Sequence, residues 1–141
     1  MHRPFCNIFS KNASSVALPT PGVYHIRVGS QRYLVEKGNC LRVENSLRRG
    51  LFNLTHNTGD GTISLFSMAR NEYVRANSDI ITCSPYLEIA KLVLCQPKKT
   101  STNGGVMILV NMKFLEASGP VIYLRDSENE ASLFEFVPVH G

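Results

Sequence analysis

The chain has 141 residues, of which 43% are hydrophobic and 18% are charged, and its formal net charge is +4. This composition excludes an intrinsically disordered chain, and the length suits one domain with a core of its own. No apolar run approaches the length of a transmembrane helix, and the modest positive charge permits an acidic partner without requiring one.

The first segment, residues 1–20, lies outside the repeating pattern described below and is predicted to be an N-terminal extension. Its start, MHRPFCNIFSKN, lacks a long apolar stretch followed by small residues, so it does not look like a signal peptide. We therefore expect a cytoplasmic protein, with a protein secreted without a recognisable signal peptide as the alternative.

The next segment, residues 22–60, alternates apolar and polar residues, as is typical of β-strands with one buried face. Tyr24, Ile26 and Val28 alternate at its start, and turn-forming Lys-Gly-Asn follows at 37–39. Further alternating pairs come after the turn. The segment is therefore predicted to contain four short strands.

The same pattern recurs twice along the chain, in residues 61–101 and 102–138. The aromatic residues Tyr33, Tyr73 and Phe114 are 40 and 41 residues apart, and an aliphatic residue follows each of them. Eight apolar columns match in all three segments. One column near the end of each segment contains Phe52, Leu92 and Phe134.

Three units of about 40 residues, each with four short strands, predict an all-β fold of the β-trefoil type with pseudo-three-fold symmetry. Six strands would close a barrel and three hairpins would cap one end, which would leave no sheet edge exposed. We expect the extension 1–20 to be followed by a single trefoil domain, 21–141. Its units would span about 22–60, 61–101 and 102–138.

The phrases RVGSQRYLVEKGN (27–39) and TISLFSMARNEYVRAN (62–77) resemble the repeat of fascin-type trefoils, in which an apolar strand and a polar turn precede an aromatic–aliphatic pair. The resemblance covers about residues 22–138. It implies a fascin-like scaffold or actin-associated module that binds a protein partner. Fibroblast growth factors and interleukin-one-type cytokines share a similar phrase, which implies a secreted receptor ligand as the alternative.

The chain departs from the fascin pattern in two respects. Fascin contains four trefoils in one chain, whereas only one is predicted here, and this chain contains no Trp at the position that closes each unit. The Gln-x-Trp motif of ricin-type lectin trefoils is absent as well. A carbohydrate-binding lectin is therefore the third hypothesis, and in it Tyr or His would supply the aromatic platform.

The sequence shows no motif of a catalytic or cofactor site, since HExxH, GxSxG and the P-loop are all absent. The glycine-rich phrase NTGDG at 57–61 precedes no predicted helix, so we interpret it as a turn between units. The acidic residues of 126–130 are expected to lie in a solvated loop. We predict no enzymatic activity, no cofactor and no metal site. The histidines expected to be solvent-exposed are His2, His25, His56 and His140.

The four cysteines form no CxxC pair and match no zinc-binding spacing. Buried or partly buried thiols are the expected state, because free cysteine behaves as a small hydrophobic residue. A single disulfide is the alternative, and it would favour the secreted form. The residues concerned are Cys6, Cys40, Cys83 and Cys95.

Basic residues of the first unit are the candidate binding surface. Arg42 stands between the apolar Leu41 and Val43, so strand alternation directs its side chain outward. An acidic protein surface or a sulfated glycan would suit these charges, whereas the lack of interleaved aromatic residues argues against nucleic acid. A long loop adds Lys98 and Lys99. The predicted binding residues of the first unit are Arg27, Arg32, Lys37, Arg42, Arg48 and Arg49.

Overall fold

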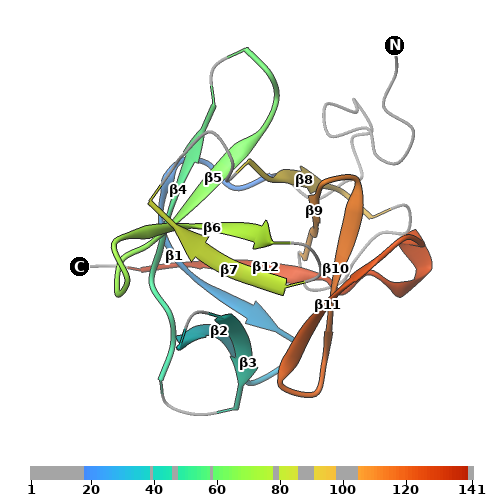
Figure 1. Ribbon diagram of the computed structural model, residues 1–141, viewed down its shortest axis with the longest axis horizontal. Coiled ribbons are helices and arrows are strands. Elements are labelled where there is room, and N and C mark those ends of the chain that lie inside the picture. The colour runs from blue at the N-terminus through green and yellow to red at the C-terminus, as the bar shows by residue number, and fades with distance from the viewer. Residues whose placement is uncertain are drawn as a thin grey trace.

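The computed structural model describes residues 18–38, 40–45, 48–57, 59–77, 80–85, 91–97 and 105–139, with the backbone alone at 40 and 80. These ranges contain twelve strands, one short 3₁₀ helix and no α-helix (Figure 1). The all-β prediction is confirmed. The strands are β1 (Gly22–Val28), β2 (Arg32–Lys37), β3 (Cys40–Glu44), β4 (Phe52–His56), β5 (Ile63–Ser67), β6 (Glu72–Asn77), β7 (Ile80–Ser84), β8 (Val93–Cys95), β9 (Met107–Val110), β10 (Lys113–Ser118), β11 (Val121–Arg125) and β12 (Phe134–Pro138), and the helix is η2 (Glu128–Glu130).

Six of the strands form a closed ring. β1 pairs with β4, β4 with β5, β8 with β9, and β12 with β1. A bridge between Ile63 and Leu92 joins β5 to the start of β8, and a bridge between Val106 and Phe134 joins β9 to β12. Each bridge has two backbone hydrogen bonds, of 2.8 and 2.9 Å in the first and 2.9 and 2.7 Å in the second. Closure leaves none of these strands with a free edge.

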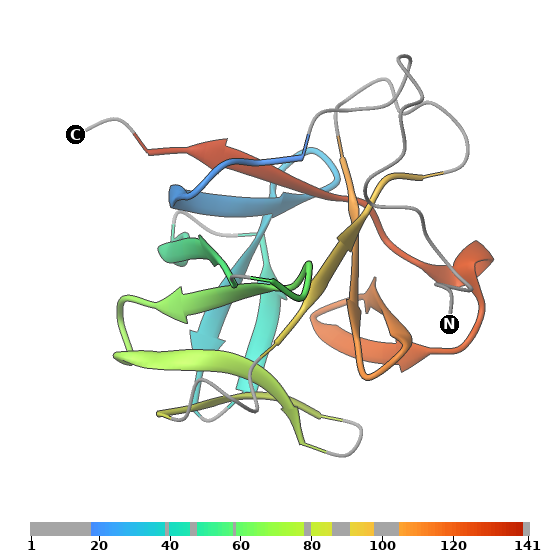
Figure 2. The same ribbon diagram turned by 90° about the horizontal axis from the view of Figure 1, so that it is seen from above.

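The other six strands form three hairpins, β2–β3, β6–β7 and β10–β11. The hairpins touch one another, because β3 contacts both β7 and β11, and β11 contacts β7. The Val43 N–H donates to the carbonyl oxygen of Pro120 at 3.0 Å, which ties the first hairpin to the third. A ring of six strands with three associated hairpins is the pairing expected of a β-trefoil, and Figure 2 shows the ring strands and the hairpins from a second direction.

Most positions of the apolar columns predicted from the repeat are buried, but Met68, which matches Val28 and Leu109 in the repeat, is 45% exposed, so the prediction is wrong at that position. Phe52, Leu92 and Phe134 occupy one such column, and each is at most 1% exposed. In β1, Ile26 and Val28 are buried, whereas Arg27 between them is half-buried. Burial of apolar side chains at roughly 25 cal/mol per Å² is the main stabilising term, so these columns fix which face of each strand turns inward.

Residues at the edge of the predicted extension contact this core. Leu18 packs against both clusters of buried side chains, and the Tyr24 hydroxyl donates to the carbonyl oxygen of Thr20 at 2.6 Å. Residues 1–17 lie outside the described part of the chain. The boundary between extension and trefoil domain stays a prediction.

Among the described cysteines, one departs from the expected free thiol and agrees with the alternative of a single disulfide. Cys95 is fully buried in β8 and is disulfide-bonded, so the prediction of a thiol there is wrong. Cys83, which is partly exposed on β7, keeps its thiol. Cys6 and the side chain of Cys40 lie outside the described residues. Disulfide pairing depends on which segments meet in space, and the spacing of cysteines along a chain does not determine it.

Candidate functional site

Several of the predicted basic residues are occupied by contacts within the molecule. Arg27 Nη2 lies 2.6 Å from Glu135 Oε1, and Lys37 Nζ lies 3.0 Å from Glu44 Oε2. The hydrogen bond that Arg27 donates to Glu135 is the main cause that raises the pKa of Arg27. Arg32 donates to a backbone carbonyl in the β10–β11 turn. Cations that are paired within the molecule attract an acidic partner less strongly than the free cations expected from the sequence.

The remaining cations of the first unit, Arg42, Arg48 and Arg49, are exposed. Arg42 projects outward from β3, as the alternation predicted, and Arg49 Cζ lies 4.4 Å above the ring centre of Tyr33. Arg27 is the cross-strand partner of Tyr33, so Arg27 and Arg49 meet at this ring. Lys98 and Lys99 lie outside the described residues.

His25 does not point into solvent as expected. Its ring is partly buried and meets the ring of Tyr33 edge-on, with the ring centres 6.2 Å apart. Its Nδ1 lies 2.9 Å from the carbonyl oxygen of Gly50, at hydrogen-bonding distance. The connection after β3 folds back over this strand face and covers the histidine, which strand alternation alone could not reveal.

An exposed aromatic ring lies on the third hairpin. Tyr123 in β11 is 40% exposed. Among the described residues, the exposed large hydrophobic side chains include one aromatic ring, and it is that of Tyr123. Arg125 Cζ lies 4.7 Å from the ring centre of Tyr123, and Arg125 Nε donates to Glu116 Oε1 at 2.7 Å. That hydrogen bond raises the pKa of Arg125. We call these three residues the β11 platform.

Strand pairing explains why these side chains meet. Tyr123 lies directly opposite Glu116 across the β10–β11 ladder, and Arg125 follows two residues later on the same face. Sequence analysis missed Tyr123, although its place beside the inward-facing Ile122 indicated an outward aromatic ring. In the repeat, Arg42 and Thr82 occupy the matching positions, so the platform is specific to the third unit.

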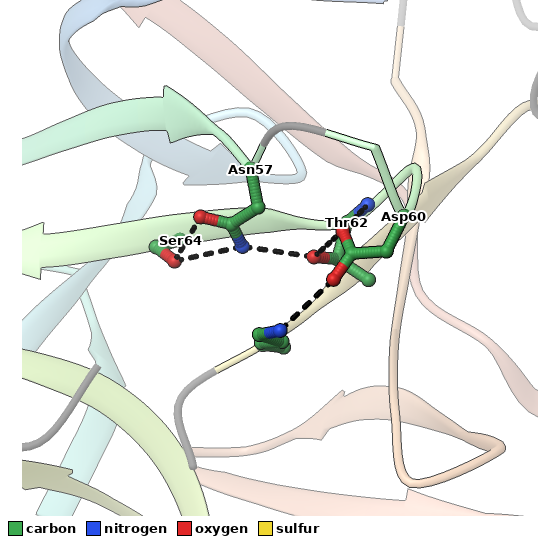
Figure 3. A network of polar contacts seen from close by, with 5 residues as sticks. Asn57, Asp60, Thr62 and Ser64 are labelled. Carbon is green, nitrogen blue, oxygen red and sulfur yellow. Dashed lines mark hydrogen bonds and ion pairs between the residues drawn. The ribbon is translucent and has the colours of Figure 1, made fainter. Parts of the chain in front are cut away.

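A cavity of about 510 Å³ opens beside the connection between β4 and β5. We call it the β4–β5 cavity. Leu18, Pro19, Ile63 and Leu94 form its apolar wall, and polar groups of the β4–β5 loop, several of which Figure 3 draws, form the remainder. The lining residues are Leu18, Pro19, His56, Asn57, Gly59, Asp60, Gly61, Thr62, Ile63 and Leu94.

The carboxylate of Asp60 is held by several donors at the rim of this cavity. Its Oδ1 accepts hydrogen bonds from the Thr62 backbone N–H at 3.1 Å and from the Thr62 hydroxyl at 2.7 Å. Lys91 Nζ lies 2.9 Å from Oδ2. The hydrogen bonds from Thr62, followed by the one from Lys91, lower the pKa of Asp60 to about 2. The carboxylate is therefore ionised at any physiological pH.

Asn57 braces the same loop from the other side, as Figure 3 shows. Its Nδ2 donates to Thr62 Oγ1 at 2.8 Å and to Ser64 Oγ at 3.1 Å, and its backbone N–H donates to the Thr62 carbonyl oxygen at 2.9 Å. The interpretation of 57–61 as a turn agrees with this connection, with residue 58 outside the described part. Sequence analysis missed the site, although Asn and Asp flanking a glycine were the available signal.

His56 is exposed, as predicted, and lines the cavity. Its Nε2 lies 3.2 Å from the carbonyl oxygen of Pro19. His2 and His140 lie outside the described residues. Within the part of the chain that the structure describes, no group of three His, Cys, Asp or Glu side chains could hold a metal ion, and no helix is long and apolar enough to cross a membrane.

No protein family matches the sequence, and no curated protein matches it. Solved structures do match. SeviL, solved bound to asialo-GM1 saccharide, is similar over 86% of this chain and 100% of its own, with a TM-score of 0.70 and 10% identity. The GH43 β-1,3-galactosidase BT0265 is similar over 86% of this chain and 28% of its own, with a TM-score of 0.67 and 12% identity. At such low identity, both likenesses establish the fold.

Proposed function

We propose that the chain is a non-enzymatic carbohydrate-binding β-trefoil with pseudo-three-fold symmetry, as the third hypothesis from the sequence has it. The likeness to SeviL, solved with a saccharide, and to a β-1,3-galactosidase supports glycan binding over a fascin-like or cytokine role. This chain spans all of SeviL but about a quarter of the galactosidase, so the galactosidase reaction is no guide to its activity.

The β11 platform is the observation that most supports this function. The exposed ring of Tyr123 offers a flat apolar surface against which the apolar face of a sugar ring can pack. Arg125 is a donor and Glu116 is an acceptor beside that surface, and their 2.7 Å hydrogen bond holds both in place. Sugar hydroxyls both donate and accept hydrogen bonds, so they suit such a pair.

In the fascin-like hypothesis, which came from the resemblance of the repeat, a basic surface would meet an acidic filament. Ion pairs of Arg27 with Glu135 and of Lys37 with Glu44 reduce the charge available to an acidic filament. We therefore expect no salt-sensitive co-sedimentation with filamentous actin. Pelleting at low salt that disappears in an Arg42→Glu variant would revive that hypothesis.

The disulfide at Cys95 supports a place outside the cytoplasm, because reducing compartments keep thiols reduced. We propose the secreted alternative in place of the expected cytoplasmic location. Alkylation of the denatured natural protein, followed by mass spectrometry, checks this. Cys95 should resist alkylation until a reductant is added, and a thiol that reacts without reductant would contradict the proposal.

Glycan binding is tested with the full chain on a glycan array and by calorimetric titration with asialo-GM1 saccharide. Removing the ring in Tyr123→Ala should weaken affinity at least about tenfold, which corresponds to about 1.4 kcal/mol. Tyr123→Phe is the matched control, because it keeps the ring and should bind like the wild type. The position is exposed, so both variants should keep the wild-type melting temperature.

The result that would overturn the proposal is clear in either assay. A chain that binds none of the glycans on the array is not a lectin. Equal affinity of Tyr123→Ala and the wild type would remove the β11 platform as the site.

A further inference from the structure

We propose that the β4–β5 cavity is a second saccharide site, which takes a neutral sugar ring independently of the β11 platform. The inference rests on the proposed carbohydrate-binding function and adds a second ligand position to it. A single chain with two unlike sites could join two glycans or two parts of one branched glycan, and would gain avidity from doing so.

The size and lining of the cavity suit a small amphipathic ligand. Its volume of about 510 Å³ falls within the range of small-molecule sites, roughly 300–1,000 Å³. Leu18, Ile63 and Leu94 contribute apolar surface, while His56 and Asp60 contribute polar atoms. Small-molecule sites typically have a largely apolar wall with a few polar groups. A sugar ring likewise has apolar faces and a polar rim, so it matches such a wall.

The hydrogen bonds of Asp60 leave room for a ligand. A carboxylate has about four acceptor positions. Oδ1 accepts two hydrogen bonds from Thr62, and Oδ2 receives one from Lys91, so with respect to the described residues one acceptor position on Oδ2 remains for a hydroxyl donor. In His56, Nε2 donates to the Pro19 carbonyl oxygen at 3.2 Å, so Nδ1 is the other polar atom that the ring brings to the site.

The charge of the site selects against ionic ligands. Lys91 Nζ lies 2.9 Å from the Asp60 carboxylate, so the pair is close to neutral when seen from the cavity. A cationic ligand would compete with Lys91, and an anionic ligand would meet Asp60. A neutral polyol can donate a hydroxyl to Asp60 Oδ2 without either penalty.

Hydrogen bonds hold the described residues of the loop in place. Asn57 joins Thr62 and Ser64, and the turn contains Gly59 with φ +87° and Gly61 with φ +73°, conformations that side chains disfavour. A fixed loop pays less ordering entropy on binding, so the Asp60 acceptor is preorganised. These hydrogen bonds, together with that between Asp60 and Lys91, form one network that extends from residues of 57–64 to Lys91 of the second unit.

The test is an NMR titration of the ¹⁵N-labelled full chain with a panel of neutral sugars that includes asialo-GM1 saccharide, galactose, glucose, mannose and N-acetylglucosamine. We expect at least one sugar to shift the Gly59, Gly61 and Thr62 amide signals in a saturable way. Those shifts should persist in Tyr123→Ala. They should require at least about fivefold more sugar in Asp60→Asn, a loss of about 1 kcal/mol.

Two further variants separate ligand binding from loop structure. His56→Ala leaves the Asp60 network intact and should also weaken the loop shifts, whereas Asp126→Asn, which changes a distant exposed carboxylate, should leave them unchanged. Shifts confined to β11 would overturn the second site and leave the lectin proposal standing. Shifts in neither region with any sugar would overturn both.

Discussion

Replacing Gly50 with alanine tests how tightly the connection between β3 and β4 packs. A Cβ at this position would lie 2.6 Å from the Leu34 carbonyl oxygen and 2.7 Å from Cε2 of Phe52. The Gly50 N–H donates to the same Leu34 oxygen at 2.9 Å, and the Gly50 carbonyl oxygen lies 2.9 Å from Nδ1 of His25. The added methyl group would therefore clash with two residues, Leu34 and Phe52.

The loss of stability depends on whether Leu34 and Phe52 can move away from the added methyl group. Leu34 belongs to paired strand β2 and Phe52 is fully buried, so neither can move away freely. Overpacking of this kind costs about 1–3 kcal/mol, and weakening one backbone hydrogen bond adds about 1 kcal/mol. We expect the free energy of unfolding to fall by about 2–4 kcal/mol, which lowers the melting temperature by roughly 6–16 °C for a domain of this size.

Urea denaturation and differential scanning calorimetry measure the change. Gly119→Ala is the control, because a Cβ there meets nothing within 4 Å and the φ of +59° alone causes strain. The control should lose about 1 kcal/mol. If Gly50→Ala is as stable as the control or more stable, the packing argument is refuted.

Two further predictions concern Asp60 in the β4–β5 loop and Phe134 in the core. The pKa of Asp60 is lowered from 3.8 to about 2, so its contribution to stability should be complete above about pH 4 and should be lost as the pH falls toward 2. An NMR titration of its carboxyl carbon checks this, and a midpoint at 3.8 or higher would contradict it. Phe134→Ala should lower the free energy of unfolding by about 3–5 kcal/mol in urea denaturation, because it empties a fully buried core position. A loss below about 1 kcal/mol would show that Phe134 does not fill the core.

The sequence by itself determined the strands and the direction of their side chains. Apolar residues at every second position place Ile26 and Val28 inward and Arg27 outward, and the 40-residue period predicts which residues share a core column. Both properties are local, because successive side chains of a strand point to opposite faces whatever the strand pairs with. The structure accordingly has Phe52, Leu92 and Phe134 buried, as the repeat predicted.

Only the tertiary structure decided which side chains meet. Arg27 is paired with Glu135, which is 108 residues away, and Asp60 with Lys91, which is 31 residues away. From the sequence, Arg27 was expected to be a free cation and Asp60 was expected to be part of a turn. Closure of the ring brings together strands that are far apart in the chain, and the identity of each partner depends on that closure. A periodic sequence specifies which face a residue occupies, but neighbours across the ring are set by non-local contacts that no local pattern encodes.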